Sequence, residues 1–229
     1  MTDMNQKEFR ESLQHIEEIL KQIFDSIRTG NLVYLDSAQS LVSRTSEQIK
    51  NYHLVAETPD KGWAAPKIGE FRLDNRQETM PDVLSEAGRK DLINRLEKII
   101  SNLSRLINIF KERISKHILF SEKAIRELEY LIGSIKYLSR CLKDVVITRN
   151  DVLLKYIIDT ANALENTADS FAAEHEERLL SGVCQPQSSA LFIDLLNTIK
   201  ENSYHFKEMG RQIASFSRGD SHRLPSKEI

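Results

Sequence analysis

The chain has 229 residues, of which 40% are hydrophobic, so it is long enough to bury a sizeable core. Its 32 basic and 34 acidic side chains give a formal net charge of −2, which argues against nucleic acid as a partner. The longest apolar run has four residues, 190–193, whereas a membrane-spanning helix needs about 20. The first residues lack the apolar stretch of a signal peptide, so we expect a cytoplasmic protein.

Apolar residues recur every three or four positions through most of the first half, which predicts amphipathic helices. The first two are predicted over residues 5–28 and 32–54, separated by Gly30, because glycine takes the left-handed conformation that ends a helix. Residues 55–84 lack this periodicity and hold three of the five prolines, so we expect an irregular connection there. A third helix is predicted over residues 85–117.

The second half shows the same helical pattern with shorter breaks. It predicts a helix over residues 121–146 and a fifth helix that Asn150 and Asp151 cap and that ends near residue 181. A last helix is predicted over residues 187–217, followed by a polar tail, 219–229. The fold class is therefore all-α.

Two stretches in the halves resemble each other at a constant offset of 123 residues. The matching residues are Leu35, Asp36, Ser37, Ala38, Gln39 and Leu41 with Ile158, Asp159, Thr160, Ala161, Asn162 and Leu164. A weaker similarity relates residues 92–114 to 191–213. The simplest interpretation is an elongated six-helix bundle of two tandem three-helix repeats, 1–117 and 118–218; chance similarity between amphipathic helices is the alternative.

Two such units, with a last helix of the form SSALFIDLLNTIKENSYHFKEMGRQIA, resemble the PhoU-like proteins. Within that group the chain is similar to the regulatory domains of sodium–phosphate cotransporters and to the accessory proteins of Pit-type phosphate transporters. The resemblance covers almost the whole chain apart from residues 55–84. It implies a cytoplasmic regulator, peripheral at the inner face of the membrane, that binds a phosphate transporter or phosphate-signalling proteins.

Members of this family often carry E-x-x-x-D motifs whose carboxylates hold iron or zinc clusters, since residues four apart share one helix face. Glu165 and Asp169 keep this spacing. The positions where other copies would fall hold Val42 and Ser46, Tyr130 and Ser134, and Lys200 and Tyr204. Because one carboxylate pair cannot fill a coordination sphere, we expect a solvated helix flank and no cofactor; a divalent or ferric ion at Glu165 and Asp169 is the alternative.

Two polar stretches need a separate interpretation. His175 continues an apolar stripe, so we expect a buried histidine, with a metal or acid–base site as the alternative. Residues 202–205, Asn-Ser-Tyr-His, interrupt the apolar seam of the last helix and predict an internal hydrogen-bond network, with a docking surface as the alternative.

No nucleophile lies at a recognisable spacing from a base, and no glycine-rich phosphate loop is present, so we do not expect an enzyme. The sequence therefore favours a regulator or accessory protein of phosphate transport. The rival hypotheses are a carboxylate-bridged metalloprotein and a generic helical scaffold that forms homodimers through an exposed apolar stripe.

Overall fold

The computed structural model describes residues 6–56 and 86–219, which form six helices and no strand. These helices are α1 (Gln6–Thr29), α2 (Leu32–Ala56), α3 (Glu86–Ser115), α4 (Glu122–Thr148), α5 (Asp151–Leu180) and α6 (Pro186–Gly219). The predicted all-α class is confirmed, and the predicted helix bounds agree to within two residues. Residues 55 and 56 of the predicted connection belong to α2, whereas 57–84 and most of the predicted tail lie outside the described residues.

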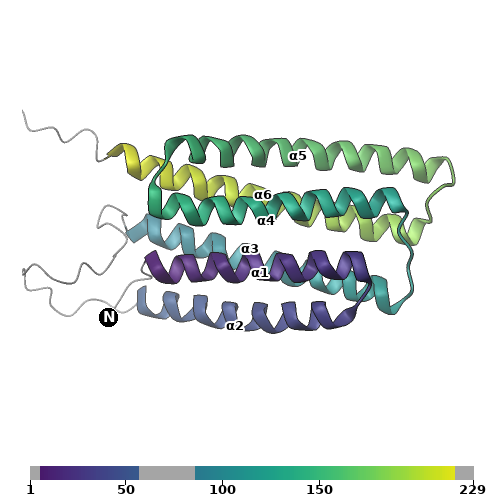
Figure 1. Cartoon of the computed structure of the whole chain (residues 1–229), viewed down its shortest axis with the longest axis horizontal. Coiled ribbons are helices and arrows are strands. Elements are labelled where there is room, and N and C mark those ends of the chain that lie inside the picture. The colour runs from purple at the N-terminus through teal and green to yellow at the C-terminus, as the bar shows by residue number, and fades with distance from the viewer. Residues whose placement is uncertain (1–5, 57–85, 220–229) are drawn as a thin grey trace, which may run out of the picture.

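The helices run side by side along one long axis (Figure 1). α2 packs against α1 and α3, and α5 packs in the same way against α4 and α6. Contacts of α1 with α4 and of α3 with α6 join these two triplets. The two triplets thus share one pattern of contacts, as a duplicated unit would require, while the division at residue 117 stays a prediction.

A single hydrophobic core extends through all six helices. Its largest fully buried side chains include Phe9, Phe110, Phe192 and Phe206. Each such side chain stabilises the fold by roughly 1.5–3 kcal/mol relative to exposure, before the entropy of ordering is counted. Among the described helices, none combines the length and hydropathy that crossing a lipid bilayer requires.

The hairpin between α1 and α2 has the same geometry as the hairpin between α4 and α5. Gly30 and Arg149 both adopt left-handed backbone, with φ of 67° and 49°, and each donates its N–H to the carbonyl four residues earlier at 2.8 Å. Asn31 and Asn150 follow, and each side-chain Oδ1 accepts from the N–H two residues later at 2.9 Å. The equivalent hairpin residues are therefore 119 positions apart.

This spacing changes the predicted register of the duplication. It is four residues shorter than the predicted offset of 123, which is about one helical turn. The first-half positions that correspond to Glu165 and Asp169 then become Ser46 and Lys50, instead of Val42 and Ser46. The first half still lacks a carboxylate pair at this place.

Candidate functional site

Two lysines of α6 reach the carboxylates that the sequence singled out on α5. Lys207 Nζ lies 2.6 Å and 2.9 Å from the two carboxylate oxygens of Glu165, and 3.2 Å from Asn162 Oδ1. Lys200 forms an ion pair with Asp169 one turn further along. Lys207 is 7% exposed, so its ammonium group depends on these partners for solvation. Glu165 and Asp169 thus tie α5 to α6.

This arrangement does not fit a metal cluster. Lys207 donates hydrogen bonds to both carboxylate oxygens of Glu165, and these oxygens are the atoms that would coordinate a metal ion. In the part of the chain that the structure describes, no three His, Cys, Asp or Glu side chains gather closely enough to hold a metal ion. Glu165 and Asp169 form an ion-pair cluster in which ammonium groups balance the carboxylates. Elemental analysis of the purified protein tests the alternative that these two residues bind a metal.

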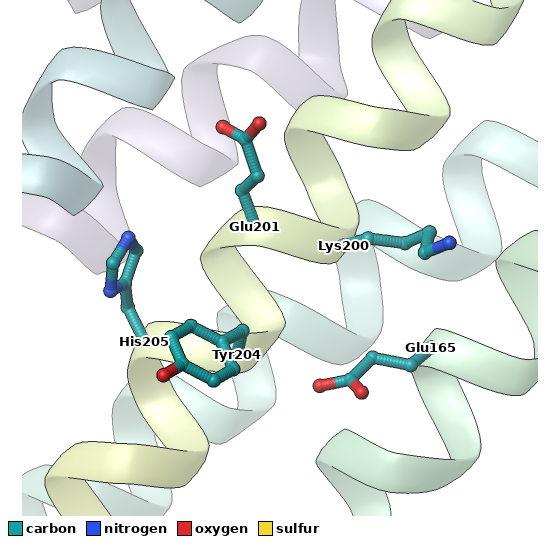
Figure 2. Close-up of a pocket in the computed structure, with 5 residues that line it drawn as sticks. All are labelled: Glu165, Lys200, Glu201, Tyr204 and His205. Carbon is teal, nitrogen blue, oxygen red and sulfur yellow. The ribbon is translucent and has the colours of Figure 1, made fainter.

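A shallow pocket of about 400 Å³ lies beside this cluster. Its lining residues are Glu165, Lys200, Glu201, Tyr204 and His205. Figure 2 shows Glu165 and Lys200 on one side of the Tyr204 ring, His205 on the other side, and Glu201 above the ring. Burial, and after it the nearby Arg95, lower the pKa of His205, so its imidazole is neutral near pH 7. The pocket therefore brings two carboxylates, an ammonium group, a phenol and a neutral imidazole together beside the ion-pair cluster.

The structure separates the four residues predicted to form one internal network. Asn202 and Ser203 are fully buried, whereas Tyr204 is 47% exposed, because consecutive helix residues point about 100° apart. Ser203 Oγ donates to the Ala161 carbonyl at 3.0 Å, but the Asn202 amide has no hydrogen-bond partner among the described residues. Among the described residues, His205 Nδ1 also lacks a hydrogen-bond partner, so the predicted four-residue network is wrong and Ser203 alone forms an internal bond.

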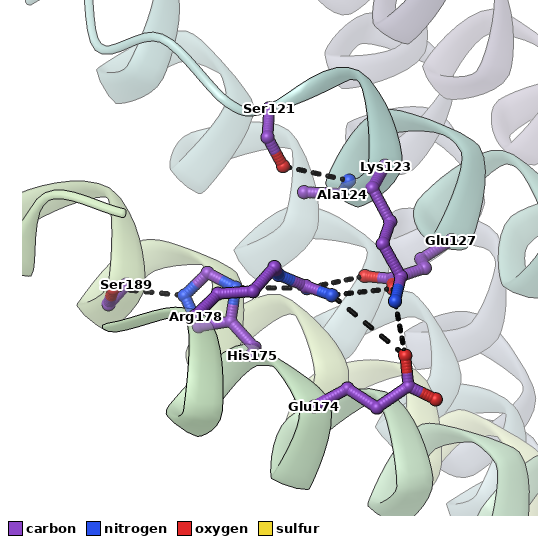
Figure 3. Close-up of polar contacts among 8 residues, drawn as sticks. All are labelled: Ser121, Lys123, Ala124, Glu127, Glu174, His175, Arg178 and Ser189. Carbon is purple, nitrogen blue, oxygen red and sulfur yellow. Dashed lines mark hydrogen bonds and ion pairs between the residues drawn. The ribbon is translucent and has the colours of Figure 1, made fainter. Parts of the chain in front are cut away.

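His175 is buried between α5 and α6, as its apolar stripe predicted. Its ring stacks on Phe192 with centroids 4.4 Å apart, and Nε2 lies 2.9 Å from Ser189 Oγ (Figure 3). Nδ1 lies 3.3 Å from Arg178 Nη2, which can only donate, so Nδ1 accepts and Nε2 carries the proton. Burial and then the Arg178 guanidinium lower the pKa of His175, which keeps the ring neutral.

Arg178 also binds Glu127 of α4 with two hydrogen bonds. Its Nη1 and Nη2 lie 3.1 Å and 2.9 Å from the two oxygens of Glu127, whose side chain is 5% exposed. Lys123 Nζ lies 3.9 Å from Glu127 and also pairs with Glu174. Figure 3 shows these side chains converging from α4 and α5. The cluster therefore links three helices at one end of the bundle.

The Ser189–His175 pair is not arranged for nucleophilic catalysis. In a serine hydrolase a carboxylate on the far nitrogen stabilises the imidazolium that forms when the histidine accepts a proton. Here that nitrogen faces the Arg178 cation, which opposes a second positive charge. Ser189 Oγ is also buried and donates to the Gln185 carbonyl at 3.0 Å. The pair is structural.

The sequence interpretation missed Glu127, Arg178 and Lys207. Glu127 and Lys207 are charged residues at inward-facing positions of their helices, where both are more than nine-tenths buried. A charge on a buried stripe needs a partner of opposite sign, and this requirement is the signal that could have identified them.

No protein-family model matches the sequence, and no curated protein matches it either. The fold matches a crystal structure from Shewanella oneidensis MR-1, whose protein is proposed to be a PhoU-like phosphate regulatory protein. The TM-score is 0.62, with 10% sequence identity, and the match covers 93% of this chain and 99% of that chain. The chain therefore has the PhoU-like fold that the sequence resemblance implied.

Proposed function

We propose that this chain is a non-enzymatic regulator or accessory protein of phosphate transport. In this proposal it acts by binding a membrane transporter, or a phosphate-signalling protein attached to one. The observation that carries the proposal is the PhoU-like fold, which extends over 93% of the chain and matches a protein described as phosphate regulatory.

The polar clusters favour a binding role over a catalytic one. His175, Ser189 and Glu127 are buried and have partners from neighbouring helices, so they stabilise the bundle and do not face a substrate. The helices are long and rigid; α6 has 34 residues and spans about 50 Å. Such helices offer extended side faces to which a partner can bind.

The proposed place of action is the cytoplasmic face of the membrane, which the chain reaches through its partner. In this arrangement the transporter provides the membrane-spanning segments and this chain contributes a helical surface. The regulator then alters transport by favouring one conformation of the transporter, which requires different affinities for the two conformations.

The proposal is tested by affinity capture from solubilised membranes of cells that express the tagged chain, grown with ample or limiting phosphate. A phosphate transporter or phosphate-signalling protein is expected among the captured proteins, in amounts that differ between the two conditions. Capture with the tag alone is the control. Finding neither class of partner in either condition would overturn the proposal.

A further inference from the structure

α5 forms one long edge of the bundle, and its outward side meets no other described helix (Figure 1). Among the described helices, α5 packs only against α4 and α6. Nine exposed residues recur at helical spacing on the outward side, and all point within about 40° of the direction of Asn166. We call these residues the α5 stripe: Val152, Lys155, Asp159, Asn162, Asn166, Ser170, Ala173, Glu177 and Leu180.

The two ends of the α5 stripe are apolar. Val152 is 79% exposed at the start of α5, and Leu180 is 83% exposed at its end. Ile147 and Val183 add exposed apolar side chains near the same two ends of α5. Val152 and Leu180 are 28 residues apart, which is about 42 Å along a helix. A partner that covers both ends therefore needs apolar groups at this separation.

The charges of the α5 stripe have both signs and are separated along it. Lys155 lies one turn from the first apolar end, and Glu177 lies one turn from the second, about 33 Å away. Asp159 lies one turn beyond Lys155 on the same helix. None of these three side chains forms an ion pair within residues 6–56 and 86–219. A cation and an anion at opposite ends of the stripe are thus available to a partner.

We infer that a second copy of this chain covers the α5 stripe in an antiparallel dimer with two-fold symmetry. Asn166 lies midway in sequence between Val152 and Leu180, and also midway between Lys155 and Glu177. A two-fold axis at Asn166 therefore places Val152 against Leu180 of the partner subunit, and Lys155 against Glu177 of the partner subunit. Each of these contacts occurs twice, because the same surface serves both subunits.

The charges select the antiparallel orientation. A parallel pair of stripes would also bring apolar ends together, but it would place Lys155 on Lys155 and Glu177 on Glu177, which like-charge repulsion disfavours. The antiparallel register places Asp159 opposite the uncharged Ala173. Asn166 meets its own copy on the axis, where the two side-chain amides can hydrogen-bond to each other. The stripe is therefore complementary to itself in this register.

Two other occupants fit the α5 stripe less well. A lipid bilayer would have to cover Asp159, Asn166 and Glu177 between the two apolar ends, and these groups would lose hydration without gaining partners. An amphipathic peptide with charges of one sign would meet either Lys155 or Glu177 with a like charge. A second copy of the stripe supplies both the apolar spacing and the opposite charges.

The expected dimer is weak. α5 has 30 residues and is about 45 Å long, so a strip about 10 Å wide on each subunit buries roughly 900 Å² in total. Interfaces of this size are typical of transient complexes, which predicts a dissociation constant in the micromolar range. The inference is independent of the proposed function, because it uses only contacts between copies of this chain.

Sedimentation velocity of the full chain tests the inference. Between about 1 μM and about 300 μM protein, the average mass is expected to rise from 26.4 kDa toward twice that value. Circular dichroism melts check that each variant below is folded. All the substituted residues are exposed, so the fold is expected to tolerate their replacement.

Charge reversal tests the register. Lys155→Glu or Glu177→Lys alone is expected to weaken dimerisation about tenfold or more, because each replaces two attractive contacts with two repulsive ones. Combining both substitutions in one chain is expected to restore the wild-type dissociation constant, at an unchanged net charge. Within one chain these two residues are about 33 Å apart, so only a contact between subunits can produce this rescue.

Loss of the apolar ends gives a second test. Val152→Ser combined with Leu180→Ser is expected to weaken dimerisation about tenfold or more, because both apolar contacts are lost in each subunit. Val33→Ser is the matched control, since Val33 is 68% exposed on α2, on the other long edge of the bundle (Figure 1). This control variant is expected to dimerise as the wild type does.

A chain that stays monomeric at about 300 μM would overturn the inference, because the expected dissociation constant is far lower. So would wild-type dimerisation by both charge-reversal variants, or failure of the combined variant to regain it. Binding of the wild type to vesicles of anionic and neutral phospholipid, lost in Val152→Ser with Leu180→Ser while the chain stays monomeric, would assign the stripe to a lipid surface instead. Membrane capture with Lys155→Glu tests the proposed function separately, since that proposal does not require the dimer.

Discussion

Arg178→Met is the substitution that best tests the buried polar cluster. It removes the guanidinium but keeps the apolar stem of a long side chain, so the packing change is small. In the wild type, Glu127 is 5% exposed and receives two hydrogen bonds from Arg178. After the substitution, Lys123 at 3.9 Å is the nearest remaining cation. A buried carboxylate would therefore lose its main partner.

The expected cost follows from these contacts. Removing one partner of a buried ion pair costs about 3–5 kcal/mol, because the remaining charge stays buried without compensation. The hydrogen bond to His175 Nδ1 is lost as well, which adds about 1 kcal/mol. Lys123 is 52% exposed and can move toward Glu127, which offsets part of the loss. We expect Arg178→Met to lower the free energy of unfolding by about 3 kcal/mol.

A double variant provides the matched comparison. Glu127→Leu combined with Arg178→Met removes both charges at once and replaces them with apolar groups of similar volume. Such replacements are often neutral, so the double variant is expected within about 1 kcal/mol of the wild type. Urea denaturation at neutral pH, followed by circular dichroism, measures both values. If Arg178→Met costs under about 1 kcal/mol, or the double variant costs as much as the single one, Glu127 is not held as a buried charge and the reasoning fails.

Three further predictions follow from single sites. Burial holds the pKa of His175 below its ordinary 6.5, so the unfolded chain binds the proton first and stability falls as the pH drops below 6.5. In urea titrations at a series of pH values, His175→Gln should reduce the dependence of unfolding free energy on pH. The part of this dependence that remains comes from His15 and His205, whose pKa values are also lowered. His117 has a φ of 52°, so His117→Gly should raise the free energy of unfolding by about 0.5–1 kcal/mol. Gly30 has a φ of 67°, so Gly30→Ala should lower it by about the same amount. Melting temperatures equal to that of the wild type would contradict both expectations. Elemental analysis of protein purified without chelator should find no stoichiometric metal, because lysines neutralise Glu165 and Asp169; one iron or zinc per chain would refute this interpretation.

The helices could be predicted because their signals are local. Apolar spacing marks each buried face, and Gly30 and Asn150 mark helix ends through their own backbone and side-chain chemistry. The register of the duplication was harder to predict. Offsets of 123 and 119 differ by four residues, which is about one helical turn. Residues matched at the two offsets therefore point in directions only about 40° apart, so both offsets match buried positions with buried positions. The hairpin geometry pairs Leu35 with Leu154, and both are buried.

The polar clusters could not be predicted because their members lie far apart in the sequence. Arg178 and Glu127 are separated by 51 residues, and Lys207 and Glu165 by 42. Which charges meet depends on how far each helix slides along its neighbour, and apolar periodicity leaves that shift open. His175 was predicted to be buried because its stripe is local, but its Arg178 and Ser189 contacts needed the packed helices.

The charges of α5 divide into two groups with different consequences. On the sides toward α4 and α6, Arg178 and Glu165 have partners from those helices, so they fix how α5 sits on the bundle. On the outward side, Asp159 and Glu177 have no ion-pair partner in the described residues, and their carboxylates contribute little to folding. These two residues are 18 positions apart, about 27 Å along the helix, so salt screens the repulsion between them. Both carboxylates are therefore expected to tolerate substitution, unlike Arg178 and Glu165.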